Sequence, residues 1–505
     1  MPSLALRLQS RSFRMGLAGT IVAVYLGLAL ASAALKAPWW DEAWFASPAW
    51  NLAQHGRMGT DVLVPGWREG LEQRTYWVMP LYLVTLAGWF KVVGFGLLRM
   101  RLLSVLAGLL ALVSWFVVMW RVTDDRRVAF LAFALIAVGH ASITLASEGR
   151  MDMMTAALSV AALAVYLSLR ERNLEHATLA GHSLAAAAML THPNGVLGFV
   201  GLALLAWMYD RPRLTPRLVA LALAPYVVAA LAWGAYIAQD PHSFVRQFFG
   251  NVEERGTGFG NLYEAIRGEV WRYIGFYAFG PHWAETRFRI LLRPVRDWPL
   301  LVPIVYFAAA IACASVRELR RRPGIAALVM LAAVSATWLT LIDTHKRYYY
   351  LVYVVPLYTA LAAVVAVWAW DHAARLRDPI VLMLTALLAT NLALDLRQMG
   401  STPEWTGYGE VVRYLQQHAS PAQRVIGGAE LAFGLGFDHG LVDDSTLGYW
   451  SREKADWIVV GMRYKGHLSD PTEPAAIRHY RERRLSECRP VLETRFYRLY
   501  AARPG

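Results

Sequence analysis

The sequence predicts an α-helical protein that crosses a membrane many times and ends in a small α/β domain. Hydrophobic residues make up 56% of the 505 residues and charged residues only 17%, whereas an ordinary soluble domain carries roughly 25% charged residues. Several apolar runs are long enough to cross the roughly 30 Å hydrocarbon core of a bilayer as helices. A simple soluble enzyme and a disordered chain are therefore excluded.

The chain is basic, with 50 lysines and arginines against 37 aspartates and glutamates and a formal net charge of +13. In a soluble protein this excess would indicate nucleic-acid binding, but in a membrane protein it is typical of basic residues that gather in cytoplasmic loops. We therefore expect no nucleic-acid partner. The two cysteines, Cys313 and Cys488, can form neither a disulfide framework nor a thiolate metal site.

The first apolar run, residues 15–35, follows Arg7, Arg11 and Arg14. Because basic residues stay on the cytoplasmic side, we expect a cytoplasmic N-terminus and an outer location for the segment after this run. The small residues at 31–33 resemble a signal-peptide cleavage site, but the length of the apolar run favours a retained membrane helix.

Five arginine-rich connectors interrupt the apolar runs that follow, and we assign them to the cytoplasm. They lie at residues 121–127, 170–172, 211–217, 317–322 and 375–377. Each joins two runs, which gives the predicted spans 102–120 and 128–145, 153–169 and 177–190, 196–209 and 219–237, 299–316 and 325–342, and 351–370 and 379–394. Together with the first run, the sequence predicts about 11 transmembrane helices.

Alternation of sides then requires that residues 79–96 do not cross the membrane but lie along its outer surface as an interfacial or re-entrant helix. The stretch 239–298 is outer by the same alternation, although Arg287, Arg289, Arg293 and Arg296 oppose the positive-inside rule there. These arginines either attract anionic lipid head groups or belong to a mobile amphipathic loop.

Beyond the last predicted span the chain is hydrophilic for about a hundred residues, which is the size of a small domain. We therefore divide it into a transmembrane domain, 1–396, whose first outer loop covers 37–99 with interfacial helices, and an outer C-terminal domain, 397–505. A helix at 410–417 and strands at 457–460 and 495–500 predict an α/β fold for this domain. The sequence contains no P-loop or dinucleotide-binding fingerprint, so nothing indicates that a nucleotide drives its chemistry.

Acidic residues lie at two places on the predicted outer surface. Asp41 and Glu42 follow two tryptophans directly after the first span, and Asp152 follows Arg150 at the outer mouth of a later helix pair. Taken alone, Asp41 is explained by helix capping and the pair of Arg150 and Asp152 by a local ion pair. Their placement on one membrane face instead suits general-base catalysis or metal binding.

Two further outer turns carry candidate binding residues. His192 lies in a Pro-Asn-Gly turn, where a structural role is the simpler interpretation. Lys346 and Arg347 precede three consecutive tyrosines, in a loop where the positive-inside rule disfavours cations. A lysine and an arginine can hold the phosphate of a lipid, although snorkelling cations beside an aromatic belt explain them equally well.

The order and sidedness of these motifs resemble the GT-C glycosyltransferases that use polyprenyl-phosphate sugars, especially the bacterial relatives of protein O-mannosyltransferases and lipid A aminoarabinose transferases. DEAWF at residues 41–45 resembles the first acidic motif of that family, and RLLS at 101–104 resembles the start of its next membrane helix. RMD at 150–152 resembles the second acidic motif, and KRY at 346–348 with Pro356 resembles the late basic-aromatic segment.

The chain departs from the family at one motif. The family commonly has a Lys-Pro-Pro stretch before Leu-Tyr, where this chain reads RTYWVMPLY at residues 74–82. Arg74 is then the candidate substitute for the missing lysine, with Tyr76 beside it as a further substrate-binding candidate.

The resemblance implies a fold of the GT-C type and an inverting transfer of a sugar from a polyprenyl-phosphate donor to a lipid, glycan or protein acceptor. Asp41 would act as base on the acceptor hydroxyl, while Asp152 and Glu42 would orient the acceptor or a divalent metal; no other cofactor is expected. Lys346, Arg347 and Arg74 would neutralise the leaving phosphate. The substrate-binding residues would be Glu42, Arg74, Tyr76, Arg150, His192, Lys346 and Arg347.

The resemblance further implies a multi-pass protein of the bacterial inner membrane, with its active face and its C-terminal domain in the periplasm. The main alternative is a transporter or flippase of lipid-linked substrates, for which polar residues within the spans would be expected. A non-catalytic membrane scaffold or sensor is a second alternative, but it assigns no purpose to the outer acidic and basic residues.

Overall fold

The computed structural model describes residues 10–63, 70–256, 258–280, 298–400, 404–438, 440–468 and 470–503. Arg287, Arg289, Arg293 and Arg296 lie outside the described residues. The chain divides into two compact units. Unit 1 consists of Met1–Ala33, Ser104–Tyr236 and Val252–Met399, and unit 2 consists of Ala34–Leu103, Ile237–Asn251 and Gly400–Gly505.

Helices occupy all the predicted spans, because an apolar run in a bilayer must satisfy its backbone hydrogen bonds within the segment. They are α2 (Arg11–Leu35), α5 (Leu97–Thr123), α6 (Arg126–Ala137) with α7 (His140–Ala146), α8 (Met151–Leu169), α9 (Leu174–Thr191), α10 (Val196–Asp210), α11 (Pro216–Ile237), α16 (Leu301–Ser315), α18 (Pro323–Ile342), α19 (Val355–His372) and α20 (Arg377–Gly400). Within the described ranges, seven helices are long and apolar enough to cross a membrane, or eight if α6 and α7 form one span. The helices α9, α10 and α19 are outside that set, so the count of 11 stays a prediction.

The predicted span 128–145 is not one continuous helix. α6 and α7 meet at an angle of 56°, and Gly139 at the break has an extended backbone. The backbone N–H of His140 donates to Asn391 Oδ1 of α20 at 2.8 Å. This side chain supplies the acceptor that an unbroken helix would have offered, so tertiary contact compensates for the break.

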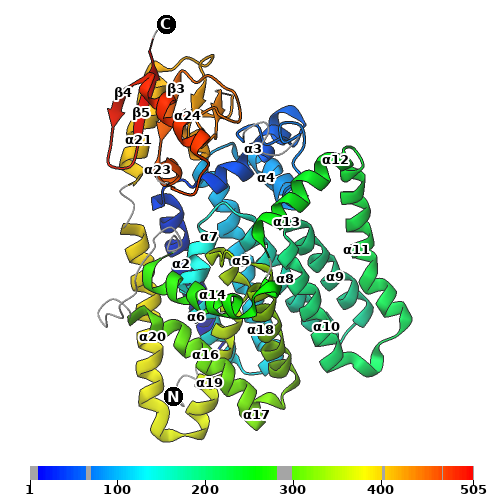
Figure 1. The fold of residues 1–505 in the computed structure, drawn as a ribbon. Coiled ribbons are helices and arrows are strands. Elements are labelled where there is room, and N and C mark those ends of the chain that lie inside the picture. The colour runs from blue at the N-terminus through cyan, green and yellow to red at the C-terminus, as the bar shows by residue number, and fades with distance from the viewer. Residues whose placement is uncertain are drawn as a thin grey trace. The chain divides into compact units, whose positions relative to one another are not determined.

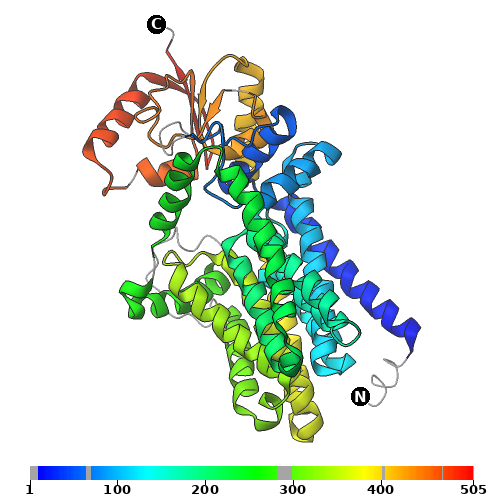
Figure 2. The same ribbon diagram turned by 90° about the vertical axis from the view of Figure 1, so that its right-hand side faces the viewer.

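The helices α8, α9 and α10 lie side by side in unit 1 (Figures 1 and 2). Glycines on α10 permit this close approach, because a Cβ at Gly198 would lie 3.1 Å from Ser159 Oγ and one at Gly201 would lie 2.9 Å from Leu163 Cδ2. Small residues are typical of such interfaces between membrane helices. The packing fixes the ends of α8, one of which carries Asp152.

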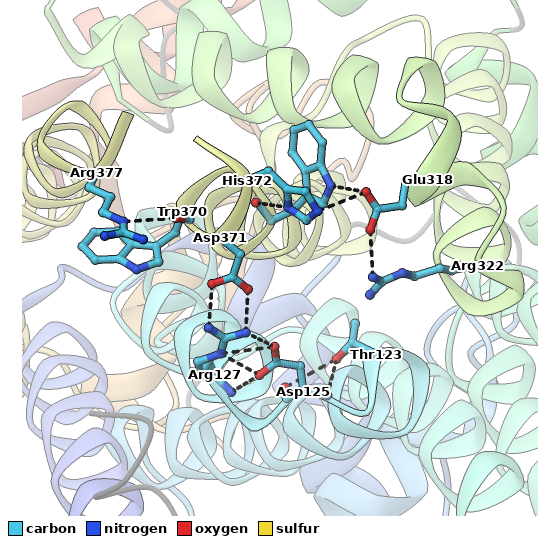
Figure 3. Close-up of polar contacts among 10 residues, drawn as sticks. Thr123, Asp125, Arg127, Glu318, Arg322, Trp370, Asp371, His372 and Arg377 are labelled. Atoms are coloured by element: carbon cyan, nitrogen blue, oxygen red, sulfur yellow. Dashed lines mark hydrogen bonds and ion pairs between the residues drawn. The ribbon is translucent and has the colours of Figure 1, made fainter. Parts of the chain in front are cut away.

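Charged residues connect three of the predicted cytoplasmic connectors at one end of unit 1. Figure 3 shows Arg127 between two carboxylates, Asp125 before α6 at 2.8 Å and Asp371 at the end of α19 at 2.7 Å. Glu318 of α17 (Arg317–Arg320) pairs with His372 at 3.3 Å. The connectors after α5, α16 and α19 therefore lie together, as the charge pattern predicts.

The first outer loop folds as helices in unit 2. α3 (Trp40–His55) packs against α4 (Pro80–Val93). α4 has 14 residues, which corresponds to about 21 Å and is less than the thickness of the hydrocarbon core. This length fits the predicted interfacial helix at 79–96.

The stretch predicted to lie outside at 239–298 is also mostly helical in its described parts. Its elements are α12 (Pro241–Phe244), the π-helical turn η3 (Val245–Phe249), α13 (Gly250–Arg255), α14 (Leu262–Ile274) and the π-helical turn η5 (Gly275–Phe279). α14 belongs to unit 1 and packs against α18.

The C-terminal domain is built on a sheet that has five strands among the described residues, in the order β2-β1-β3-β5-β4. The strands are β1 (Val425–Ile426), β2 (Leu441–Val442), β3 (Trp457–Val460), β4 (Cys488–Glu493) and β5 (Arg498–Ala502). β1 is parallel to β2 and β3, while β5 is antiparallel to β3 and β4. The accompanying helices are α21 (Glu404–His418), α22 (Ala432–Leu435), α23 (Met462–Leu468) and α24 (Ala475–Ser486).

This domain confirms the predicted small α/β fold and corrects its details. The predicted helix 410–417 is the C-terminal part of α21, and the predicted strand 457–460 coincides with β3. The strand predicted at 495–500 begins only at Arg498, because a tight turn in which Thr494 N donates to Tyr497 O at 2.8 Å connects β4 and β5.

The C-terminal domain also contacts the first outer loop within unit 2. Asp443 N donates to Val62 O at 2.8 Å, and Trp44 Nε1 of α3 donates to Asp443 Oδ2 at 2.9 Å. Phe95 stacks on Phe433 with ring centroids 5.8 Å apart. The sequence predicts the tail as a domain by itself, so this contact is a feature that only the structure reveals.

Candidate functional site

Asp41 lies in the first turn of α3 and is half-buried. The positive end of the helix dipole favours a carboxylate at this position. The backbone N–H of Trp39 donates to Glu42 Oε2 at 3.0 Å, so the side-chain cap of this helix comes from Glu42. The alternative role of Asp41 as the helix cap is corrected accordingly.

Glu42 is fully buried and forms an ion pair with Arg101 of α5. Arg101 Nε and Nη2 donate to the two carboxylate oxygens of Glu42, each at 2.7 Å. The same guanidinium donates at 2.8 Å to the carbonyl oxygens of Lys36 and Ala37. This fork fixes the segment between α2 and α3, and with it the position of Asp41.

Arg74 and Tyr76 lie in a segment of unit 2 that is held by the side chain of Gln247. Gln247 Nε2 donates to Arg74 O at 3.0 Å, and its Oε1 accepts from Tyr76 N at 2.7 Å. Arg74 Nε donates to Gln239 Oε1 at 3.2 Å, and the Tyr76 ring packs edge-on against Phe244 at 6.0 Å. Arg74 is half-buried, whereas Tyr76 is buried.

Arg150 and Asp152 form a buried ion pair in unit 1, with Arg150 Nε 3.0 Å from Asp152 Oδ2. The guanidinium lies over the Tyr349 ring, 3.7 Å from its centroid. Tyr353 donates its hydroxyl to Asp152 Oδ1 at 3.3 Å. The pair predicted from the sequence is therefore present, and the tyrosines that follow Lys346 and Arg347 surround it.

His192 joins the same group of residues. Its Nδ1 accepts from Asn194 N at 3.0 Å, and its Nε2 lies 3.5 Å from the Tyr350 hydroxyl. The imidazole also stacks on the Tyr353 ring at 6.2 Å, which links it to Asp152. The hydrogen bond within the turn supports the structural interpretation of this histidine.

Lys346 and Arg347 belong to a neighbouring set of charges in unit 1. Lys346 is buried and lies 3.5 Å from Glu269 of α14. Arg272 of α14 lies 3.2 Å from Glu269 and 3.0 Å from Asp343, and Arg347 lies 3.0 Å from Asp343. Three cations thus share two carboxylates in a buried environment.

The balance of this set favours an anionic ligand. Burial disfavours the charged forms of both Lys346 and Glu269, since it lowers the pKa of Lys346 and raises the pKa of Glu269. One shift disfavours a positive charge and the other a negative charge, so together they leave the surplus positive charge of the set unchanged. Arg272 is fully buried, and its Nε and Nη1 have no hydrogen-bond partner among the described residues. Since buried guanidinium donors are costly to leave unsatisfied, Arg272 is a further candidate for contact with a phosphate.

The structure adds residues that the sequence analysis did not select. Tyr348 donates its hydroxyl to Glu148 Oε1 at 3.0 Å, next to the pair of Arg150 and Asp152. The run of three tyrosines was a sequence signal for Tyr348, whereas Arg272 had none because α14 reads as an ordinary amphipathic helix. Within the described ranges, no group of three or more histidine, cysteine, aspartate or glutamate residues could hold a metal ion.

The fold is similar to that of solved membrane glycosyltransferases. ArnT from Cupriavidus metallidurans bound to undecaprenyl phosphate has a TM-score of 0.61 and 16% identity, with 97% of this chain and 99% of that chain covered. The apo state of the same protein gives 0.51 at 16% identity, over 97% and 100% of the two chains.

A second similar structure is the Archaeoglobus fulgidus oligosaccharyltransferase tethered with an acceptor peptide. Its TM-score is 0.52 at 14% identity, and 88% of this chain and 69% of that chain are covered. No protein-family model and no curated protein sequence matches the chain. The chain therefore has a GT-C type fold like that of ArnT, as the resemblance predicts.

Proposed function

We propose that this chain is a membrane glycosyltransferase. It moves a sugar from a polyprenyl-phosphate-linked donor to a lipid, glycan or protein acceptor on the outer face of the membrane. The observation that carries this proposal is the similarity in fold, over nearly the full length of both chains, to ArnT bound to undecaprenyl phosphate. The acidic and basic residues described above support it, because they supply the chemistry that such a transfer needs.

In the proposed reaction, Asp41 takes the proton of the acceptor hydroxyl as that oxygen forms a bond to the anomeric carbon of the sugar. The bond from the anomeric carbon to the phosphate oxygen breaks, the configuration inverts, and polyprenyl phosphate leaves. Glu42 has both oxygens bound by Arg101. We therefore assign Glu42 a positioning role, in which it fixes the first turn of α3 and the carboxylate of Asp41.

The leaving phosphate requires positive charge that is fixed before the reaction. We assign this role in unit 1 to Lys346, Arg347 and Arg272, whose excess of charge over Glu269 and Asp343 is one positive unit.

In unit 2 we assign the role of the missing family lysine to Arg74. Its Nε donates to Gln239 Oε1, and we assign its terminal guanidinium nitrogens to the phosphate. In unit 1, Asp152 is oriented by Arg150 and Tyr353 and binds the acceptor. We keep Tyr76 of unit 2 as a substrate-binding residue, whereas His192 has the structural role that its turn hydrogen bond supports.

The proposed location is a bacterial inner membrane, with a cytoplasmic N-terminus and a periplasmic C-terminal domain. The arginine-rich connectors of unit 1 that ion pairs hold together support this orientation, because basic connectors remain in the cytoplasm. We retain the boundary between the transmembrane domain, 1–396, and the C-terminal domain, 397–505, as part of the proposal.

The test is transfer of labelled sugar from a panel of polyprenyl-phosphate sugars to membrane extract by the purified full chain. We expect turnover with at least one donor and its loss in Asp41→Asn. Asp61→Asn is the matched control, because Asp61 lies in the same outer loop and its partly exposed ion pair with Arg57 contributes little.

Two outcomes would contradict the proposal. Asp41→Asn with full activity in folded protein would remove Asp41 as the base. No turnover with any donor, in folded protein that still binds polyprenyl phosphate, would favour the flippase alternative.

A further inference from the structure

A cavity of about 310 Å³ lies between α2, α5 and α6 in unit 1. Its lining includes Arg11, Arg14, Phe116, Trp120, Arg126 and Phe130. This is the end of α2 and α6 that the charge pattern predicts to be cytoplasmic, away from the proposed reaction on the outer face. The proposed glycosyl transfer uses none of these residues.

The arginines of this cavity have no ion-pair partner among the described residues. Arg11 and Arg14 are one turn apart on α2 and therefore share a face, and Arg126 is the first residue of α6. The next residue, Arg127, differs because Asp125 and Asp371 bind its guanidinium (Figure 3). The positive charges of Arg11, Arg14 and Arg126 can therefore bind an anionic ligand.

The backbone adds to this positive potential. α2 begins at Arg11, so the N-terminal end of this helix is at the cavity. The N-terminus of α6 is instead capped by Asp125, whose Oδ1 accepts from Arg127 N at 2.8 Å. The helix dipole places partial positive charge at an N-terminus and favours an anion there. An arginine side chain then offers a planar fork of donors that matches the oxygens of a phosphate.

The remaining lining is apolar. The Phe116 and Phe130 rings pack edge to face with centroids 5.0 Å apart, and the Trp120 ring lies 5.8 Å from the Arg126 guanidinium. A site with cations and an adjoining aromatic wall suits a ligand with a negative head and a hydrocarbon tail. A free inorganic anion would use only the cations.

We propose that this cavity binds the phosphate head group of an anionic membrane phospholipid, with the start of an acyl chain against Phe116 and Phe130. Basic pockets between membrane helices on the cytoplasmic side are suited to such head groups. The volume is that of a small ligand site rather than of a packing defect. A bound lipid would contact α2, α5 and α6 together, because all three helices line the cavity.

The test measures binding to the full chain purified in detergent, by native mass spectrometry and by the shift in thermal unfolding temperature. The probes are phosphatidylglycerol, phosphatidylcholine and inorganic phosphate. We expect saturable binding and stabilisation with phosphatidylglycerol only. Arg11→Gln, Arg14→Gln and Arg126→Gln combined should weaken the apparent affinity about 100-fold, since each basic residue contributes roughly fivefold near an anionic lipid.

The matched control removes the same charge elsewhere on the predicted cytoplasmic side. It combines Arg320→Gln, Arg321→Gln and Arg375→Gln, three exposed arginines outside the cavity. This variant should bind phosphatidylglycerol within about twofold of the wild type, because only general attraction to the lipid is lost.

Four results would overturn the proposal. They are equal loss of affinity in both triple variants, equal binding of phosphatidylcholine, full competition by inorganic phosphate at the same concentration, and no lipid binding at all. If the first triple variant does not fold, the single charge reversal Arg126→Glu replaces it, and unchanged affinity in that variant would also overturn the proposal.

Discussion

Replacement of Arg101 by methionine tests the contact on which the position of Asp41 depends. Arg101 and Glu42 have side chains only 1% and 0% exposed, so solvent does not screen their interaction. Methionine fills much of the same volume but supplies no donor. The change therefore leaves the carboxylate of Glu42 buried without its cation, and it also removes the donors to the carbonyl oxygens of Lys36 and Ala37.

The expected loss of stability follows from the buried charge. Removal of one partner of a buried ion pair costs about 3 to 5 kcal/mol, because the remaining charge is uncompensated. Glu42→Gln combined with Arg101→Met should recover part of this loss, since a neutral amide is less costly to bury. The two substitutions should therefore be strongly non-additive, as expected for residues in direct contact.

The assay is the free energy of unfolding in mixed micelles, measured by denaturant titration for the wild type, both single variants and the double variant. Arg99→Met is the matched control, because Arg99 lies on the same helix, is exposed, and donates from its Nη1 to Phe95 O at 3.1 Å. It should change stability by no more than about 0.5 kcal/mol. An Arg101→Met protein within about 1 kcal/mol of the wild type would refute the reasoning.

Three further outcomes are expected. Asp152→Asn removes the carboxylate that pairs with the buried Arg150 guanidinium. It should therefore lower the free energy of unfolding by about 3 kcal/mol and reduce sugar transfer. An unchanged free energy of unfolding and unchanged transfer would contradict this expectation. Burial raises the pKa of Glu430 from 4.5 to about 7. The folded state then holds a proton that the unfolded state has lost between these values, so stability should fall by on the order of 3 kcal/mol as the pH rises through this window. Unfolding at pH 5 and pH 8 should show that slope in the wild type but not in Glu430→Gln. Trp44→Phe removes the 2.9 Å hydrogen bond to the buried Asp443 carboxylate and should cost about 1.5 kcal/mol; the same titration checks it, and no loss would mean that this contact does not secure α3.

The membrane helices could be predicted because each depends on its own sequence. A long apolar run has no alternative to a helix in a bilayer, since every backbone group must be paired within the segment. The break between α6 and α7 could not be predicted in this way. It depends on Asn391, which is remote in sequence and accepts from His140 N only after α20 has packed in place.

The candidate residues show the same division. The ion pair of Arg150 and Asp152 is local, two positions apart, and the sequence predicted it. The contact of Tyr353 with Asp152 joins residues 201 positions apart, and the contact of Arg272 with Asp343 joins residues 71 positions apart. No spacing rule covers such contacts, because they arise from the packing of separate helices.

Hydropathy and charge along the chain identify a helical membrane protein with basic connectors, in which acidic residues and tyrosines lie near predicted helix ends. These properties follow from hydropathy, charge and local geometry along one segment at a time. Three features emerge only from the folded chain: Glu42 binds Arg101 and caps α3, Lys346 is buried against Glu269, and the C-terminal domain contacts α3 through Asp443. The physical reason is that the partner of a buried charge or hydrogen-bonding group is selected by three-dimensional proximity, which hydropathy does not encode.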